Sequence, residues 1–166
     1  MLRCARVKTG ATLSTKKPPS GSVAPAGFAH RNLPLLLLQA RERVIGRFRP
    51  VLNAHGVTEQ QWRIIRALLE VGSYEPREIG EVCRISSPSL AGVLARMDDL
   101  GLVVRKRVAH DQRRVREALT PKSRAIAARI APLVEATYRV LEDEVGAQLL
   151  DRLYRTLDEV LALPPS

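Results

Sequence analysis

Hydrophobic residues recur at intervals of three and four along most of the chain from residue 31, a spacing typical of helices with one buried face. The first such helix is expected to begin after Asn32, with Pro34 in its first turn, and to end at His55-Gly56. Pro50 is expected to kink it or thin it near its end. Its broad apolar face consists of Leu33, Leu36, Leu37, Ala40, Val44, Ile45 and Phe48.

Further helix starts are marked by capping residues. Thr58 and Gln61 have the spacing of a capping box, which predicts a second helix that continues through Trp62 and Ile65. Pro76 begins a short third helix. Thr120 as a cap, followed by Pro121, predicts the start of a long helix. Gly146 separates this helix from a last one.

The stretch from Ile85 to Thr120 predicts a short helix, a strand, a charged tip and a second strand. Ser86 and Ser87 are N-cap residue types, Pro88 fits the first helical turn, and Gly101 is a typical stop. This order of elements is that of a winged helix-turn-helix. In that arrangement one helix enters the DNA major groove, and the hairpin tip reaches the backbone or the minor groove.

The hairpin itself is strongly basic. Residues 102–108 alternate apolar and basic positions as a half-buried strand does, and residues 115–119 can return beside them. The tip between them, His110 to Arg114, has Asp111 as its one acid and suits phosphates or a narrow minor groove. The residues expected to contact DNA are Ser86, Ser87, Pro88, Ser89, Arg96, Arg105, His110, Gln112, Arg113 and Arg114.

The predicted fold is therefore mainly α with a small β-hairpin wing, in the order αααα-ββ-αα. We expect a disordered basic tail over residues 1–30 and one winged-helix domain over 31–163. Within it, 57–120 form the DNA-binding lobe, while 31–56 and 121–163 form dimerisation helices. These end helices have more apolar residues than a small winged helix can cover, which predicts a homodimer. Such a two-fold dimer reads pseudo-palindromic DNA with half-sites roughly 34–36 Å apart.

Composition agrees with a polyanionic partner such as double-stranded DNA. The 166 residues carry a formal net charge of +10. Residues 1–30 hold half of that excess and no acid, so this tail is a nonspecific DNA-binding arm, a spacer or the product of an upstream start codon. The chain has no secretory or transmembrane run, and Cys4 and Cys83 are isolated, so we expect a cytoplasmic protein without membrane contact.

The residues leave three other functions to consider. An enzyme is disfavoured because the three histidines lack metal-ligand spacing and no Gly-rich phosphate loop or nucleophile motif is present; neither cofactor nor metal is expected. A redox sensor of the same fold would use Cys83, although a cysteine near the end of a helix is more often a core residue. A sequence-blind architectural DNA-binding protein would not discriminate an operator from random DNA.

Several separated blocks resemble one family of regulators. The run Asp111-Gln112-Arg113-Arg114 with Leu119-Thr120 matches the DxR…LT signature of the multiple-antibiotic-resistance-regulator (MarR) family, and the resemblance covers about residues 31–163. Residues 38–42, 48–50, 58–66 and 88–90 resemble, more narrowly, the homoprotocatechuate-degradation regulators of that family. The resemblance implies a homodimeric repressor of an aromatic-acid catabolic operon that a small aromatic carboxylic acid releases from its operator.

The resemblance also implies a ligand site made of Asn32, Glu59, Trp62, Arg66 and Tyr138. Spacings of three and four place the middle three on one helical face. Arg66 offers a planar fork for a carboxylate, Trp62 an aromatic face and Glu59 an acceptor for a ring hydroxyl or ring N–H. Without the resemblance, Trp62 would be read as a core anchor, and Arg66 and Glu59 as surface charges.

Two positions depart from the subgroup. Ser87 stands where relatives commonly have an arginine just before Pro88, which removes a strong phosphate or guanine contact. Pro34 replaces a polar residue that helps some relatives hold the ligand carboxylate, and His30 or Asn32 could compensate. The sequence therefore does not identify the operator. It does not identify the inducer either, and hydroxyphenylacetate, homoprotocatechuate and hydroxynicotinate-like acids all remain candidates.

Overall fold

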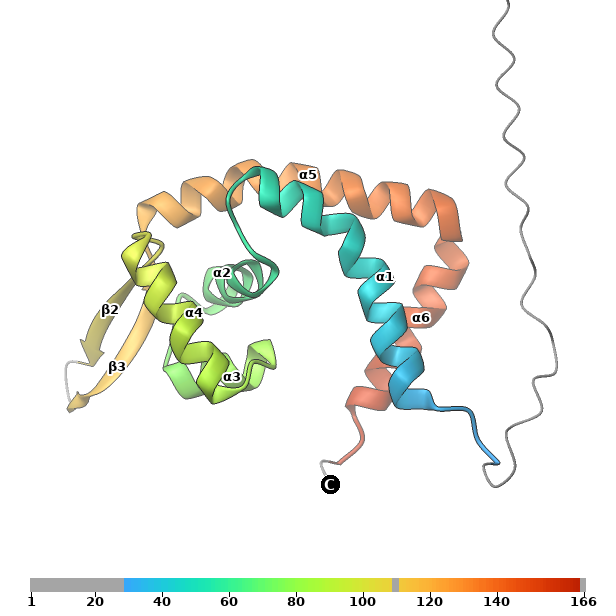
Figure 1. The fold of residues 1–166 in the computed structure, drawn as a ribbon, viewed down its shortest axis with the longest axis horizontal. Coiled ribbons are helices and arrows are strands. Elements are labelled where there is room, and N and C mark those ends of the chain that lie inside the picture. Colours follow the sequence, from blue (N-terminus) through green and yellow to red (C-terminus); the bar gives the residue numbers. More distant parts are fainter. Residues whose placement is uncertain (1–28, 109–110, 165–166) are drawn as a thin grey trace, which may run out of the picture. The chain divides into compact units, whose positions relative to one another are not determined.

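The computed structural model describes residues 29–108 and 111–164. The described chain divides into two units between residues 38 and 39, so the helix α1 begins in the first unit and continues in the second. The elements, labelled in Figure 1, are α1 (Leu33–Ala54), α2 (Glu59–Val71), β1 (Ser73–Tyr74), α3 (Pro76–Cys83), α4 (Ser87–Asp99), β2 (Val103–Val108), β3 (Asp111–Leu119), α5 (Pro121–Val145) and α6 (Ala147–Leu161). The predicted mainly α fold with a small β wing is confirmed.

Local capping explains where the helices begin. The Asn32 carboxamide oxygen accepts from the backbone N–H of Leu35 at 3.1 Å, at the start of α1. Thr58 Oγ1 accepts from the N–H of Gln61 at 3.3 Å, and Gln61 Oε1 accepts from the N–H of Thr58 at 2.9 Å, which is the predicted capping box. α1 continues through Pro50 as a helix.

The sheet has three antiparallel strands in the order β1-β3-β2, so the structure adds a strand to the predicted hairpin. β1 pairs with β3 through Ser73 opposite Ala118. A two-residue strand has no periodicity of its own, and pairing with a distant segment determines it. The expected loop was also too long: the backbone from Asp111 to Arg114 belongs to β3, and the pairing becomes irregular between Arg107 and Val108.

The hydrophobic core surrounds α2, which packs against α3, α4, α5 and the sheet. Ile64, Ile65 and Leu68 of α2 are completely buried. α4 buries Leu90, Leu94 and Met97, as its helical spacing predicts. Figure 1 shows α2, α3 and α4 together beside the β2–β3 hairpin. The helix-turn-helix and the wing therefore share one core, and α2 is its central element.

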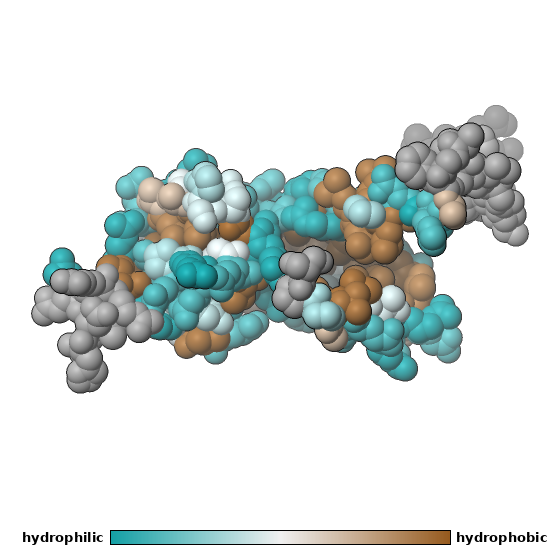
Figure 2. Space-filling model, turned by 90° about the horizontal axis from the view of Figure 1, so that it is seen from below, coloured by the Kyte–Doolittle hydropathy of each residue, from teal (hydrophilic) through white to brown (hydrophobic). Residues whose placement is uncertain are grey.

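The last helices of the chain are much less buried. The first part of α5 contributes Ala127, Ile130 and Val134 to the core, whereas α6 buries none of its residues. Large hydrophobic side chains exposed on these two helices are Leu133, Val140, Val145, Leu149, Leu153, Tyr154, Val160 and Leu161. Hydrophobic residues are visible at the surface in several areas of Figure 2. Within the described residues, no helix combines the length and the apolar character needed to cross a membrane.

Candidate functional site

A cavity of about 280 Å³ lies between the later part of α1, α2 and α5. Four of the five residues predicted for ligand binding line it: Glu59, Trp62 and Arg66 of α2, and Tyr138 of α5. The remaining lining residues are Arg41, Val44, Ile45, Phe48, Arg63 and Val134. Asn32 belongs to the other unit, where it caps α1, and its role in ligand binding stays a prediction.

Aromatic side chains form part of the apolar wall of the cavity, together with Val44, Ile45 and Val134. The rings of Phe48 and Tyr138 pack with their centroids 4.7 Å apart and their planes at 56°. Trp62 is 9% exposed and belongs to the hydrophobic core as well as to the cavity wall. Trp62 is therefore both a core residue and a part of the cavity wall, and its contact with a ligand stays a prediction.

Arg66 brings a positive charge to this apolar surface. Its side chain is exposed, and it makes no hydrogen bond or ion pair with any residue that the structure describes. A guanidinium presents five N–H donors in a planar fork that fits a carboxylate. Arg66 can therefore accept an anionic ligand without first breaking a contact within this part of the protein.

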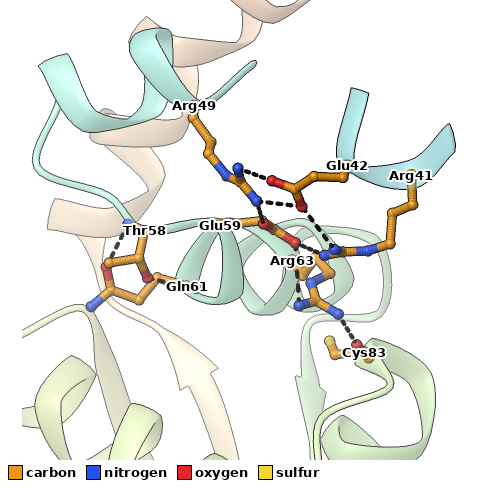
Figure 3. A network of polar contacts seen from close by, with 8 residues as sticks. All are labelled: Arg41, Glu42, Arg49, Thr58, Glu59, Gln61, Arg63 and Cys83. Carbon is orange, nitrogen blue, oxygen red and sulfur yellow. Dashed lines mark hydrogen bonds and ion pairs between the residues drawn. The ribbon is translucent and has the colours of Figure 1, made fainter. Parts of the chain in front are cut away.

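Glu59, which was predicted to accept from a ring hydroxyl or ring N–H of a ligand, already has partners within the protein. Figure 3 shows it at the centre of a network of arginines from α1 and α2. Its Oε1 pairs with Arg41 and, at 3.4 Å, with Arg63, and its Oε2 accepts from Arg49 at 3.3 Å. Both oxygens are therefore engaged with three cationic side chains, of which Arg41 and Arg63 line the cavity.

The network extends further along α1 (Figure 3). Arg49 donates to Glu42 as well as to Glu59, with Nη2 at 3.0 Å from Glu42 Oε2. This hydrogen bond, together with the positive charges of Arg49 and Arg41, lowers the pKa of the Glu42 carboxyl below its ordinary value, although burial opposes the shift. The sequence alone does not single out Arg41, Arg49 and Arg63, because the partner of each surface arginine depends on the fold.

Arg63 also reaches the helix-turn-helix. Its Nη1 donates to the backbone carbonyl oxygen of Cys83, the last residue of α3, at 2.7 Å. Cys83 itself is 5% exposed, and burial raises the pKa of its thiol while the charge of Arg63 opposes that shift. Because the thiolate is the reactive form, a buried thiol that ionises less readily argues against Cys83 as a redox sensor.

The predicted DNA-reading residues at the start of α4 are accessible. Ser86, Ser87, Pro88 and Ser89 are all exposed, and Ser86 Oγ donates to Ser89 Oγ at 3.0 Å. Arg96 is exposed near the other end of the helix. The first turn of α4 thus presents small hydroxyl side chains, which can donate to phosphates or base edges at short range.

Of the wing residues predicted to contact DNA, only Arg105 has a side chain that the structure describes. Arg105 of β2 forms an ion pair with Glu117 of β3 at 3.3 Å, so its positive charge is partly balanced within the sheet. Lys106 and Arg107, which the sequence analysis did not select, are exposed beside it. His110 lies outside the described residues, and so do the side chains of Gln112, Arg113 and Arg114. Their contacts with DNA stay predictions.

Comparison of the sequence with known proteins gives one consistent assignment. The sequence profile of the MarR family matches residues 55–114. The homoprotocatechuate degradative operon repressor of Escherichia coli is 39% identical over 134 residues, which cover 81% of this chain and 90% of the repressor. The HTH-type transcriptional regulator FarR of Neisseria gonorrhoeae is 37% identical over 136 residues, 82% of this chain and 93% of FarR.

Solved structures of transcriptional regulators have a similar fold. The transcriptional regulator PA4135 superposes with a TM-score of 0.78 at 39% identity, covering 82% of this chain and all of that one. NadR in complex with 4-hydroxyphenylacetate gives 0.72 at 36% identity, covering 84% of this chain and 99% of NadR. The repressor CouR, bound to a 23-mer DNA duplex, gives 0.71 at 27% identity, covering 78% of this chain and 92% of CouR.

Proposed function

Because this chain belongs to the MarR family of transcriptional regulators, we propose that it is a homodimeric repressor that a small aromatic carboxylic acid releases from its operator. It would act in the cytoplasm on an operon for aromatic-acid catabolism. Residues 57–120 would form the DNA-binding lobe, and residues 31–56 and 121–163 the dimerisation helices. The basic tail over 1–30 would add nonspecific affinity for DNA.

Specific DNA binding would come from α4 and the wing. The exposed hydroxyls of Ser86, Ser87 and Ser89 would face the major groove, with Arg96 near the far end of the helix. Arg113 and Arg114 of the wing would bind phosphates or the minor groove. Since Ser87 stands where subgroup relatives commonly have an arginine, the wing would carry more of the affinity. The DNA-bound structure of CouR supports this assignment of the fold.

The ligand assignment depends above all on one observation: Arg66, unpaired among the described residues, borders a cavity with Trp62, Phe48 and Tyr138 on its walls. A single aromatic ring would pack on these side chains, and its carboxylate would accept from the Arg66 guanidinium. The Tyr138 hydroxyl can donate to the same carboxylate. Hydroxyphenylacetate, homoprotocatechuate and hydroxynicotinate-like acids all fit this description, and the NadR complex with 4-hydroxyphenylacetate supports the class.

The homodimer would form through the end helices. α6 has an exposed apolar face and buries no residue against the rest of the described chain, and α5 adds Val140 and Val145. A second copy would cover these surfaces with two-fold symmetry and place two α4 helices at major-groove spacing. An acid bound at the Arg66 cavity would shift this arrangement only by as much as it prefers one state to the other.

The test begins with a thermal-shift screen of aromatic acids on the full-length protein, followed by operator titrations with and without each stabilising acid. Arg66→Met removes the charge but keeps an apolar stem. It should leave operator affinity within about 2-fold and weaken the acid about 10- to 100-fold, the range for a lost charged hydrogen bond. Arg129→Met, on an exposed arginine of α5 outside the cavity, is the matched control and should respond as wild type.

Two results would contradict the proposal. If Arg66→Met is released by the same acid concentrations as wild type, the ligand site is elsewhere. If a random duplex of equal length binds as tightly as the operator at physiological salt, the protein is not a specific regulator, because specific sites are preferred roughly 10³-fold or more.

A further inference from the structure

We propose that Arg63 is a positioning residue that transmits occupancy of the Arg66 cavity to the turn between α3 and α4. This inference rests on the proposed function, because it describes how an acid in that cavity would act on DNA binding. Arg63 is the side chain that both lines the cavity and contacts the end of α3 among the contacts described above. It connects the candidate ligand site with the helix that would read DNA.

The three groups of the Arg63 guanidinium have different surroundings. Nη1 donates to the Cys83 carbonyl oxygen at 2.7 Å, and Nη2 lies 3.4 Å from Glu59 Oε1. Nε is buried and has no hydrogen-bond partner among the described residues. Figure 3 shows Arg63 between Glu59 and Cys83. The planar group therefore has one short contact with the turn, one longer contact beside the cavity, and one nitrogen, Nε, without a partner among the described residues.

The turn that Arg63 contacts is conformationally demanding. Arg84, directly after Cys83, is left-handed at φ 51° and ψ 51°, and no other non-glycine residue in the described ranges has a positive φ. A side chain in this region raises the energy of the backbone, so surrounding contacts must hold it there. The N–H of Ile85 donates to the Gly80 carbonyl oxygen at 3.0 Å, and Ser86 follows as the N-cap of α4.

A bound acid would change the contacts of Arg63. The guanidinium is rigid and planar, so moving one of its N–H groups moves the others with it. A carboxylate held by Arg66 would attract the positive charge of Arg63 across the cavity without becoming its hydrogen-bond partner, and on the cavity side Arg63 is held only by the longer 3.4 Å contact with Glu59 Oε1. Drawing Arg63 toward the cavity would lengthen its bond to the Cys83 carbonyl oxygen and loosen the turn that sets the start of α4.

The experiment compares wild type, Arg63→Met and the control Arg129→Met, each as the full chain. 4-Hydroxyphenylacetate is the first probe, with homoprotocatechuate and 6-hydroxynicotinate beside it. Calorimetry measures the affinity for acid, and fluorescence anisotropy measures the operator affinity with and without saturating acid. We expect Arg63→Met to bind acid within about 3-fold of wild type. The loss of operator affinity caused by acid, typically 5- to 150-fold for coupled sites, should fall below about 2-fold in this variant.

A second measurement does not depend on any variant. Amide hydrogen exchange at Arg84, Ile85 and Ser86 should become faster in wild type when acid binds, because the turn opens more often. If Arg63→Met does not fold, this measurement and the variant Arg63→Lys decide the question. A lysine ammonium cannot present two donors in a fixed plane, so Arg63→Lys should also lose most of the coupling.

The outcomes separate this inference from the proposed function. If acid releases wild type and Arg63→Met equally, or leaves exchange at the turn unchanged, the inference is wrong and the proposed function stands. If Arg63→Met no longer binds acid, Arg63 is a direct ligand contact, which also overturns the inference. If no acid affects wild type, the proposed function fails and the inference fails with it.

Discussion

Glu117 is a buried carboxylate with an incomplete set of partners. It is 2% exposed, Arg105 lies 3.3 Å from its Oε1, and its Oε2 has no partner among the described residues. Burial raises the pKa of Glu117 above its ordinary value, Arg105 opposes the shift, and the charge of Asp98 adds to it. The ionised form is therefore less favourable in the folded protein than in the unfolded chain.

This shift has a defined effect on stability. Below the ordinary pKa, Glu117 is protonated in both states and carries no penalty. As the pH rises toward the raised folded value, the unfolded chain loses the proton first, so the free energy of unfolding falls. Glu117→Gln should therefore be more stable than wild type at pH 7, by on the order of 1 kcal/mol, with a smaller difference near pH 4.5. Urea unfolding at both pH values measures this, and a variant destabilised at pH 7 would show that the Arg105 pair outweighs burial.

Cys83 allows a direct test of the redox alternative. Its thiol is buried and has a raised pKa, whereas alkylation and peroxide oxidation require an accessible thiolate. In a Cys4→Ser background, iodoacetamide at pH 7 should label Cys83 at least about 100-fold more slowly in the native protein than in urea. Mass spectrometry over time measures the rate. Equal rates in both conditions would revive the cysteine-based sensor.

Among the secondary-structure elements, α2 has the most roles. It supplies the three cavity residues Glu59, Trp62 and Arg66, packs against the helix-turn-helix and the sheet, and carries Arg63. Its start is fixed by the reciprocal hydrogen bonds of Thr58 and Gln61. A change at this cap should therefore affect the stability of the whole lobe.

Thr58→Ala should lower the free energy of unfolding by about 1 kcal/mol, the usual effect of losing an N-cap side chain. Thr156→Ala is the matched control, because Thr156 is exposed inside α6 and its hydroxyl only bonds back to the Arg152 carbonyl oxygen. That control should change stability by less than about 0.5 kcal/mol. Chemical denaturation of both variants provides the comparison, and equal effects would show that the cap contributes nothing specific.

Helix boundaries were predictable because local chemistry decides them. Asn32, Thr58 and Thr120 cap helices through their own side chains, and Gly146, at φ 84°, lies between α5 and α6 as the sequence indicates. β1 was not predictable, since two residues become a strand only by pairing with β3.

The cavity likewise has residues that local spacing predicts and residues that only the packing of the fold brings together. Glu59, Trp62 and Arg66 share a helix face by spacing, and all three line the same cavity, while their contact with a ligand stays a prediction. Arg41 and Arg63 were not selected, because a chain with 27 lysines and arginines gives no local sign of which ones meet Glu59. Their partners follow from the packing of α1 and α2, which the spacing of residues within one helix does not specify.

For the molecule as a whole, the exposed apolar face of α6 makes the dimer testable. Leu149 is 49% exposed and Leu153 is 43% exposed, one helical turn apart. Leu149→Glu with Leu153→Glu should give a monomer at micromolar concentration, because each copy would bring charges into the interface. Operator affinity should then fall at least about 100-fold, since the second half-site no longer adds avidity.

Sedimentation equilibrium and operator titration measure these two effects. The control replaces the nearby polar residues Gln148 and Arg152, both exposed on α6, with glutamate, which also adds two acidic side chains. It should remain a dimer. A leucine variant that stays dimeric would place the interface on other surfaces of the chain.

The position of β2 in the sheet has a consequence that does not involve DNA. β2 is an edge strand, and its exposed residues Arg105, Lys106 and Arg107 are consecutive and basic. Unpaired strand edges can associate with the edges of other molecules, and a row of positive charges opposes this. When no operator is present, these side chains would protect the protein from edge-to-edge aggregation. Replacing them with neutral residues to weaken DNA binding would therefore also reduce solubility, so loss of binding by such variants must be separated from loss of monodisperse protein.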